Sequence, residues 1–246
     1  MHQRIALVTG GIGGLGLEIC RTLATAGCKV VAVDLPATPE RQAGFEQAIA
    51  GLDIHLEATD VSDFDACAAL VGTVQQRFGA LDILVNNAGI TRDATLRKME
   101  LAQWDAVLRV NLDSAFNLCR HAIEGMQSRG FGRVINISSI SGQTGNFGQS
   151  NYAAAKAGLH GFTMSLAREV ASKGITVNSI SPGYVETPMT RAMPDAVRER
   201  IVASVPVGRI GQPADIARTV AFLAEDSAGY ITGANIPVNG GLLMGF

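Results

Sequence analysis

The chain has 246 residues, of which 47% are hydrophobic and 17% are charged, and its formal net charge is -2 at pH 7. This length suits a single α/β domain with a large core, and the composition excludes an intrinsically disordered chain. The chain has no basic run that would attract nucleic acid and no apolar run of the roughly 18 to 20 residues that span a bilayer. We therefore expect one domain over residues 1–246, with neither nucleic acid nor a membrane as its partner.

The 4 cysteines are scattered, with no C-x-x-C pair or other metal-binding spacing. We interpret Cys20, Cys28, Cys67 and Cys119 as small buried hydrophobic residues in a reducing cytoplasm, and we expect no metal site. The first residues have no signal-peptide layout and predict a first strand, which agrees with a cytoplasmic protein.

The first apolar run, Ile5 to Thr9, leads into the stretch T-G-G-I-G-G-L-G (9–16), and helical periodicity follows from Leu17 to Ala26. This order of strand, glycine loop and helix predicts a cradle for a pyrophosphate. Backbone amides at the helix N-terminus point at the anion, and missing side chains let it approach. A plain tight turn is the alternative, since the spacing is G-x-x-x-G-x-G. The cofactor-binding residues expected here are Gly10, Ile12, Gly13, Gly14, Leu15 and Gly16.

The second strand, Lys29 to Val33, ends at Asp34. An acid at this position can accept hydrogen bonds from both ribose hydroxyls of an adenosine and repels a 2′-phosphate. Glu40 adds to that repulsion, and Arg41 is the only nearby base. This balance favours NADH over NADPH, with a simple strand-end cap as the alternative role of Asp34.

A third strand is predicted at 54–58, and Asp60 and Val61 follow it where a loop could flank an adenine ring. The fourth strand, 81–85, ends in N-N-A-G-I (86–90). Small residues and amides at the carboxyl end of a strand suit close approach of a ligand to the backbone, although a turn uses the same residues.

Amphipathic periodicity predicts helices at 63–78 and 100–120, and Asn111 lies within the apolar surface of the second. A buried Asn needs partners, so it either forms a polar pair between helices or holds an ordered water. The helix predicted at 152–170 has few charges and small residues on several faces. Such a helix is buried nearly all round, which in an outer layer indicates contact with another subunit.

The fifth strand, Arg133 to Ile137, delivers Ser139 to a loop, and Tyr152 and Lys156 follow on one face of a helix, one turn apart. An ammonium beside a phenol favours the phenolate and lowers its pKa from roughly 10, as proton exchange near neutral pH requires. Ser139 could hydrogen-bond the same substrate oxygen. The pattern Y-x-x-x-K alone also occurs often by chance on helices, where the Tyr is only a packing residue.

The sixth strand, 175–180, ends in S-P-G-Y-V-E-T-P (181–188), and the amphipathic segment 189–206 has the character of a lid. A helix at 213–224 and a seventh strand at 235–238 complete the chain. Strands and helices alternate throughout, which predicts a parallel sheet with helices on both faces.

The whole chain resembles the short-chain dehydrogenases/reductases. The residues that carry the resemblance are T-G-G-I-G-G-L-G (9–16), N-N-A-G (86–89), Asn111, Ser139, Y-A-A-A-K (152–156) and P-G-Y-V-E-T (182–187). It implies a Rossmann-type, doubly wound sheet of seven parallel strands. It also implies an NAD(P)H-dependent oxidoreductase that acts on a CH–OH or C=O group, and usually a homotetramer.

The resemblance further implies roles for single residues. Tyr152 is the general acid in reduction, Lys156 lowers its pKa and binds the nicotinamide ribose, and Ser139 hydrogen-bonds the substrate carbonyl. Asn111 supports a water linked to Lys156. The further cofactor-binding residues implied are Asn87, Ala88, Gly89, Ile90, Pro182, Gly183, Val185 and Thr187, together with Tyr152 and Lys156.

A narrower resemblance is to the acetoacetyl-CoA reductases of polyhydroxyalkanoate synthesis. It is carried by N-N-A-G-I-T-R-D (86–93), R-K-M (97–99), G-N-F-G-Q-S-N-Y (145–152), K-A-G-L-H-G-F-T-M (156–164) and the terminal N-G-G-L-L-M-G. It implies stereospecific reduction of a 3-oxoacyl-CoA to the 3-hydroxyacyl-CoA in polyhydroxybutyrate synthesis. The residues implied to line the acyl-CoA pocket are Asp93, Ser139, Asn146, Phe147, Gln149 and Tyr184.

Such reductases commonly use NADPH, which Asp34 and Glu40 oppose, so we expect either an NADH-preferring member or relaxed cofactor choice. The main alternative substrate is a 3-oxoacyl thioester of acyl carrier protein, because Arg92, Arg97 and Lys98 could form a basic docking surface or meet CoA phosphates. A remote alternative is a regulator that senses a dinucleotide without catalysis.

Overall fold

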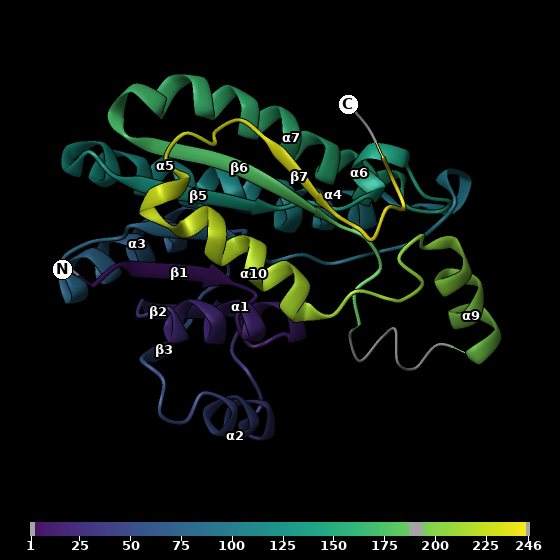
Figure 1. The fold of residues 1–246 in the computed structure, drawn as a ribbon, viewed down its shortest axis with the longest axis horizontal. Coiled ribbons are helices and arrows are strands. Elements are labelled where there is room, and N and C mark those ends of the chain that lie inside the picture. The colour runs from purple at the N-terminus through teal and green to yellow at the C-terminus, as the bar shows by residue number, and fades with distance from the viewer. Residues whose placement is uncertain (1–2, 187–193, 245–246) are drawn as a thin grey trace.

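The computed structural model describes residues 3–186 and 194–244, within which seven parallel strands form one sheet in the order β3-β2-β1-β4-β5-β6-β7 (Figure 1). The predicted α/β class, with a Rossmann-type, doubly wound sheet of seven parallel strands, is confirmed within these residues. The strands are β1 Ile5–Thr9, β2 Lys29–Asp34, β3 Ile54–Ala58, β4 Ile83–Asn86, β5 Gly132–Ile137, β6 Ile175–Pro182 and β7 Asn235–Val238.

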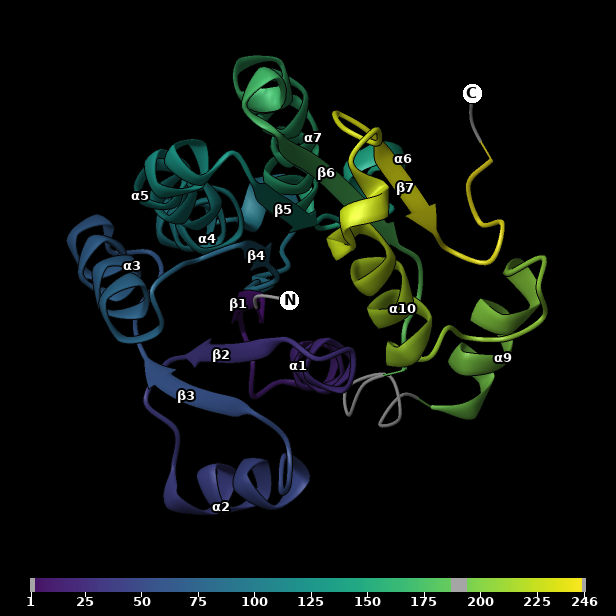
Figure 2. The same ribbon diagram turned by 60° about the vertical axis from the view of Figure 1, so that its left-hand side comes forward.

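Helices cover both faces of the sheet. Figure 2 shows α1 and α10 together on one face, and α3, α5 and α7 on the other. The helices are α1 Gly14–Thr25, α2 Pro39–Ala48, α3 Phe64–Phe78, α4 Leu101–Leu108, α5 Ser114–Arg129, α6 Ser141–Thr144, α7 Ser150–Val170, α9 Asp195–Ser204 and α10 Pro213–Ala224.

The strands contribute side chains to two separate hydrophobic cores, one on each face of the sheet, because successive side chains of a strand point to opposite faces. In β1, Ile5 and Leu7 pack into the core formed with α3, α5 and α7, whereas Ala6 and Val8 pack into the core formed with α1 and α10. Both faces are apolar, so the strands read as near-continuous hydrophobic runs, which is why sequence located them.

The centre of the sheet contains a reversal of strand order. β1 pairs with β2 on one side and with β4 on the other, although β2 and β3 intervene in the chain. The loops that leave β1 and β4 therefore diverge to opposite faces, and the crevice between them at the carboxyl edge is the usual ligand site of such sheets.

The predicted helix at 100–120 is wrong in detail. Two helices occupy this region, α4 and α5, and a π-helical turn, Arg109–Asp113, separates them. The extra residue of a π turn changes which side chains face inward, and such turns often occur at functional sites. Asn111 lies in this turn, where it is buried.

The prediction that the helix from 152 to 170 is buried nearly all round is also wrong for the single chain. One face of α7 is exposed, and Met164 on it is 53% accessible to solvent. The other exposed residues on that face are small or polar: Ala154, Ala157, Gly161, Ser165 and Arg168.

Helix α2 was not predicted, because only Phe45 of its side chains is buried and no apolar stripe marks it. Its N-terminal signals were nevertheless present, since Thr38 caps the helix and Pro39 occupies its first turn. Part of the predicted lid at 189–206 forms α9, and its residues 189–193 lie outside the described residues, as does Thr187. In the described part of the chain, no helix has the length and apolar character to cross a membrane.

Candidate active site

The glycine loop after β1 has the shape of a phosphate cradle. Gly13 is the N-cap of α1, which has no side-chain cap and no acidic residue in its first turn. Its first amides therefore stay available to an anion. A Cβ at Gly16 would collide with the carbonyl oxygen of Gly10, so packing demands glycine there. At Gly13 a Cβ would meet only that oxygen, at 3.5 Å, so packing does not demand glycine. Its missing side chain instead leaves room for a ligand.

The carboxylate of Asp34 lies against this loop. Its two oxygens accept hydrogen bonds from the backbone N–H of Ile12, at 3.2 Å, and of Leu35, at 3.0 Å. Glu40 stands in the first turn of α2, where hydrogen bonds from its own backbone N–H and from the Thr38 side chain lower its pKa. One carboxylate therefore ends β2 and a second stands in the first turn of α2, on the side where the ribose of a bound dinucleotide is predicted.

The loop after β3 is held by hydrogen bonds of its own and by one from α5. Asp60 accepts hydrogen bonds from the N–H and Oγ of Ser62, at 2.9 and 2.7 Å. Val61 is buried, and its carbonyl oxygen accepts a hydrogen bond from Asn117 Nδ2 at 3.1 Å. The predicted contact of Asp60 and Val61 with an adenine ring stays a prediction.

The loops after β1 and β4 are joined through Thr9, whose role the sequence reasoning missed. Thr9 Oγ1 accepts hydrogen bonds from the backbone N–H groups of Asn87 and Ala88, both at 2.9 Å. In return, Asn87 Nδ2 donates to the carbonyl oxygen of Thr9 at 2.8 Å. A polar residue at the end of a buried strand was the available signal. Thr9 fixes the predicted dinucleotide-binding residues of β4 against the glycine loop.

Behind this junction, a chain of buried amides connects β4 and β5 to α7. Asn86 Nδ2 donates to Asn136 Oδ1 at 2.8 Å, and Asn136 Nδ2 donates to Thr163 Oγ1 at 2.9 Å. The sheet register places Asn86 directly beside Asn136. These bonds hold α7 at a fixed height on the sheet, so they position the residues near its N-terminus.

Helix α7 presents Tyr152 and Lys156 on one face, as the spacing predicts. Lys156 Nζ lies 5.7 Å from the centroid of the Tyr152 ring and donates a hydrogen bond to the carbonyl oxygen of Ile137 at 2.7 Å. Ser138 Oγ donates to the carbonyl oxygen of Lys156 at 2.8 Å. The end of β5 therefore holds both the backbone and the side chain of the lysine.

Asn111 is brought to the same place by the π-helical turn. Its Oδ1 accepts a hydrogen bond from the N–H of Ile90 at 2.8 Å, and its Nδ2 donates to the carbonyl oxygen of Ile90 at 2.9 Å. Its partner is therefore loop backbone rather than another helix. A Cβ built on Gly89 would lie 3.5 Å from Lys156 Nζ and 3.6 Å from Asn111 Oδ1, so the three residues converge.

The predicted substrate residues other than Ser139 fall into two groups. Gln149 Nε2 donates to Asp93 Oδ2 at 2.9 Å, Asn146 Nδ2 donates to Gln149 Oε1 at 3.0 Å, and Phe147 between them is 89% exposed. Tyr184 instead lines a separate cavity of about 270 Å³, beside residues such as Val207 and Arg209.

The segment after β6 is tied to its neighbours. The carbonyl oxygen of Pro182 accepts a hydrogen bond from Ile140 at 2.9 Å, the N–H of Gly183 donates to Val238 at 3.1 Å, and Val185 forms a parallel bridge with Gly211. The predicted nicotinamide contacts therefore lie at the carboxyl edge of the sheet, apart from Thr187, which lies outside the described residues.

Comparison with known proteins decides the family. The family model described as "Enoyl-(Acyl carrier protein) reductase" matches residues 10–243. An acetoacetyl-CoA reductase of Allochromatium vinosum is 58% identical over 98% of this chain and 99% of its own length. One of Cupriavidus necator is 51% identical over the full length of both chains (100% each). A 3-oxoacyl-(acyl-carrier-protein) reductase of Vibrio cholerae is 46% identical over 99% of each.

The chain belongs to the short-chain dehydrogenase/reductase family. As a member it is an oxidoreductase that acts on a CH–OH or C=O group with a nicotinamide dinucleotide. The residues present fit that cofactor, because the uncapped N-terminus of α1, the open position at Gly13 and the Asp34 carboxylate offer sites for a pyrophosphate and a ribose. Within the described residues, no group of three or more His, Cys, Asp or Glu side chains could hold a metal ion.

The electrostatics of this reductase site differ from prediction at Tyr152. Burial raises the pKa of the Tyr152 hydroxyl, the Ser139 side chain lowers it by a hydrogen bond, and the charge of Asp93 raises it further. The expected net lowering of the Tyr152 pKa is therefore wrong in this structure, because the cost of burying the phenolate is the largest contribution. The Lys156 ammonium, which is hydrogen-bonded to the carbonyl oxygen of Ile137, does not reverse it. Burial also lowers the pKa of Lys156 to about 8. The spacing in the sequence predicted that Tyr152 and Lys156 are neighbours, but it could not predict how deeply the fold buries each of them.

The Thr9 junction gives a testable prediction. Thr9→Val keeps the side-chain shape but leaves two backbone N–H groups without an acceptor, so we expect the free energy of unfolding to fall by about 1–3 kcal/mol. NADH affinity should fall too, since the loop of Asn87 loses its anchor. Thr9→Ser, which keeps the hydroxyl, serves as the control. Denaturant unfolding and NADH fluorescence titration measure both effects, and a Val variant within about 0.5 kcal/mol of wild type would contradict this role.

Proposed function

We propose that this reductase converts a 3-oxoacyl-CoA, first of all acetoacetyl-CoA, into the 3-hydroxyacyl-CoA for polyhydroxybutyrate synthesis. The observation that carries the proposal is the convergence of Tyr152, Lys156 and Asn111 in a chain 58% identical to an acetoacetyl-CoA reductase over nearly its whole length. The 4 buried, unpaired cysteines support a reducing, cytoplasmic setting for this reaction.

Four residues would carry the chemistry. When bound, the dinucleotide would supply the hydride that the 3-keto carbon accepts. The Tyr152 hydroxyl donates its proton to the carbonyl oxygen, and the Ser139 hydroxyl donates a hydrogen bond to the same oxygen. A raised pKa keeps Tyr152 protonated at neutral pH, as a general acid must be. The Lys156 ammonium then opposes the charge left on the phenolate, and Asn111 holds the loop of Ile90 beside it.

Removing the proton donor tests the assigned roles. Tyr152→Phe should lower kcat by about 10²- to 10⁴-fold, the usual contribution of general acid catalysis, while NADH still binds. The matched control is Tyr230→Phe, because Tyr230 is fully exposed at 101% and touches none of these residues. Stopped-flow or initial-rate assays measure the effect. A Tyr152→Phe variant that keeps more than about a tenth of the wild-type rate, a loss of only about 1.4 kcal/mol, would remove Tyr152 from its role.

The alternative substrate is a 3-oxoacyl thioester of acyl carrier protein, which the similarity to the Vibrio cholerae enzyme supports. Initial rates with acetoacetyl-CoA and with the carrier-protein thioester at equal concentration separate the two. We expect the higher kcat/KM with acetoacetyl-CoA, and the reverse order would favour the alternative. Binding of NADH without turnover of any ketone would favour a dinucleotide-sensing regulator.

We also propose that NADH is the preferred cofactor. Asp34 and Glu40 place two carboxylates near the predicted ribose, where they repel a 2′-phosphate. Asp34→Asn removes the charge but keeps an oxygen that can accept the N–H of Ile12. We expect wild type to favour NADH, and the variant to lower the NADH/NADPH ratio of kcat/KM by at least about tenfold. Equal or better wild-type turnover with NADPH would contradict this preference.

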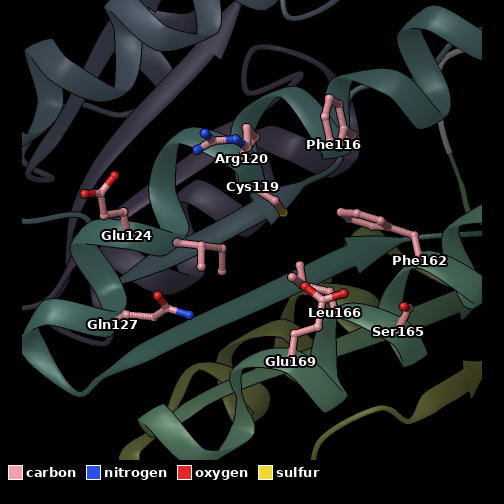
Figure 3. Close-up of a pocket in the computed structure, with 10 residues that line it drawn as sticks. Phe116, Cys119, Arg120, Glu124, Gln127, Phe162, Ser165, Leu166 and Glu169 are labelled. Carbon is pink, nitrogen blue, oxygen red and sulfur yellow. The ribbon is translucent and has the colours of Figure 1, made fainter.

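We propose a homotetramer in which α5 and α7 pack against the same helices of another copy. Figure 3 shows the cavity between them, about 470 Å³ in volume, with Cys119, Phe162 and Leu166 toward its centre. The charges at its rim suit a two-fold contact, because Arg120 on α5 could meet Glu169 on α7 of the other copy.

Light scattering after gel filtration tests this assembly. Met164→Lys places a charge on the exposed face of α7 and should yield a smaller species. Leu35→Lys, at another exposed apolar residue, should leave the tetramer intact. A monomeric wild type, or a Met164→Lys variant of unchanged mass, would contradict the proposed interface.

A further inference from the structure

The loop between β4 and α4 carries two free cations near the site. Arg97 and Lys98 are exposed at the end of the 3-10 helix Leu96–Lys98. Neither side chain has a hydrogen bond or an ion pair to any part of the chain that the structure describes. Asp93, the acid that precedes this turn, is engaged with Gln149. Residues 92–100 hold three cations, Arg92, Arg97 and Lys98, and two acids, Asp93 and Glu100, so this stretch has a formal charge of +1 on a chain whose formal net charge is -2.

This loop is fixed to the residues that lead into Tyr152. The N–H of Ala94 donates to the carbonyl oxygen of Gly148 at 2.9 Å, and Asn151 Nδ2 donates to the carbonyl oxygen of Arg92 at 3.1 Å. At its far end, Ser150 Oγ contacts Met99 Sδ at 3.7 Å. Both ends of the loop thus rest on the segment 148–151, so its cations stand in a defined place at the mouth of the site.

The same surface offers apolar contacts. Leu96, on the cationic turn, is 76% exposed, and Phe147, next to the segment that anchors the loop, is 89% exposed. A ligand that combines phosphate groups with an aromatic base can use both kinds of contact. Two adjacent cations with an exposed aliphatic side chain match that combination.

We propose that the turn Leu96–Lys98 binds the phosphate groups of the CoA portion of the substrate, an inference that rests on the proposed function. Coenzyme A carries a diphosphate and a 3′-phosphate at the end opposite the thioester, whereas a carrier-protein thioester carries one phosphodiester. A protein partner would in addition cover about 800 Å² of this surface. Two cations on a three-residue turn suit the smaller and more highly charged group.

Three thioesters test the assignment: acetoacetyl-CoA, acetoacetyl-N-acetylcysteamine, which has no phosphate, and the acetoacetyl carrier-protein thioester. In the double variant Arg97→Gln/Lys98→Gln we expect KM for acetoacetyl-CoA to rise about three- to tenfold with kcat unchanged. KM for acetoacetyl-N-acetylcysteamine should stay the same. The matched control, Arg21→Gln/Lys173→Gln, also removes one exposed Arg and one exposed Lys, and should leave both values unchanged.

Ionic strength gives a second readout. Because exposed charges are screened by salt, KM of wild type for acetoacetyl-CoA should rise with salt, and the double variant should lose most of that dependence. In the double variant, an equal change in KM for the two small thioesters, or no change for either, would overturn the assignment. A rise in KM confined to the carrier-protein thioester would overturn it as well. A wild type with a higher kcat/KM for acetoacetyl-CoA than for the carrier-protein thioester upholds the proposed function whatever the variant does, whereas inactivity on all three thioesters would overturn both.

Discussion

Lys156 is only 3% exposed, and the one hydrogen bond that its ammonium forms within the described residues, 2.7 Å long, is to the carbonyl oxygen of Ile137. No carboxylate pairs with it in this part of the chain, so burial lowers its pKa to about 8 from 10.5. Keeping it charged at neutral pH costs a few kcal/mol of stability, a cost that disappears as the pH rises above both values. The proposed chemistry gives a reason for that cost, because a phenolate beside the ammonium would be stabilised.

The rest of the site is built by contacts between elements that meet at the carboxyl edge of the sheet. Thr9 joins the loops of β1 and β4, Asn136 links β5 to α7, and Asn111 holds the loop at Ile90. Each contact satisfies buried polar groups that would otherwise be costly. The reversal of strand order supplies the crevice, and these bonds fix what lines it.

Sequence predicted the sheet well, because buried parallel strands are continuous apolar runs bounded by Gly, Asn and Asp. Spacing alone placed Tyr152 and Lys156 on one helical face. Spacing could not show the π-helical turn at Asn111, because the apolar pattern continues through that turn. It also could not show the hydrogen bond between Thr9 and Ala88, because these two residues are 79 positions apart in the sequence. The pKa of Tyr152 was mispredicted for the same reason, because burial depends on the whole fold.

The pH dependence of kcat/KM for reduction tests the role of the buried ammonium most directly. With a Lys156 pKa of about 8, the rate should fall above that pH as the amine becomes neutral and no longer stabilises the phenolate. Lys156→Arg keeps a positive charge throughout, so its residual activity should lack this fall, while any ionisation of the substrate affects both proteins equally. A wild-type profile that is flat to about pH 10, or that falls identically in the variant, would contradict the account.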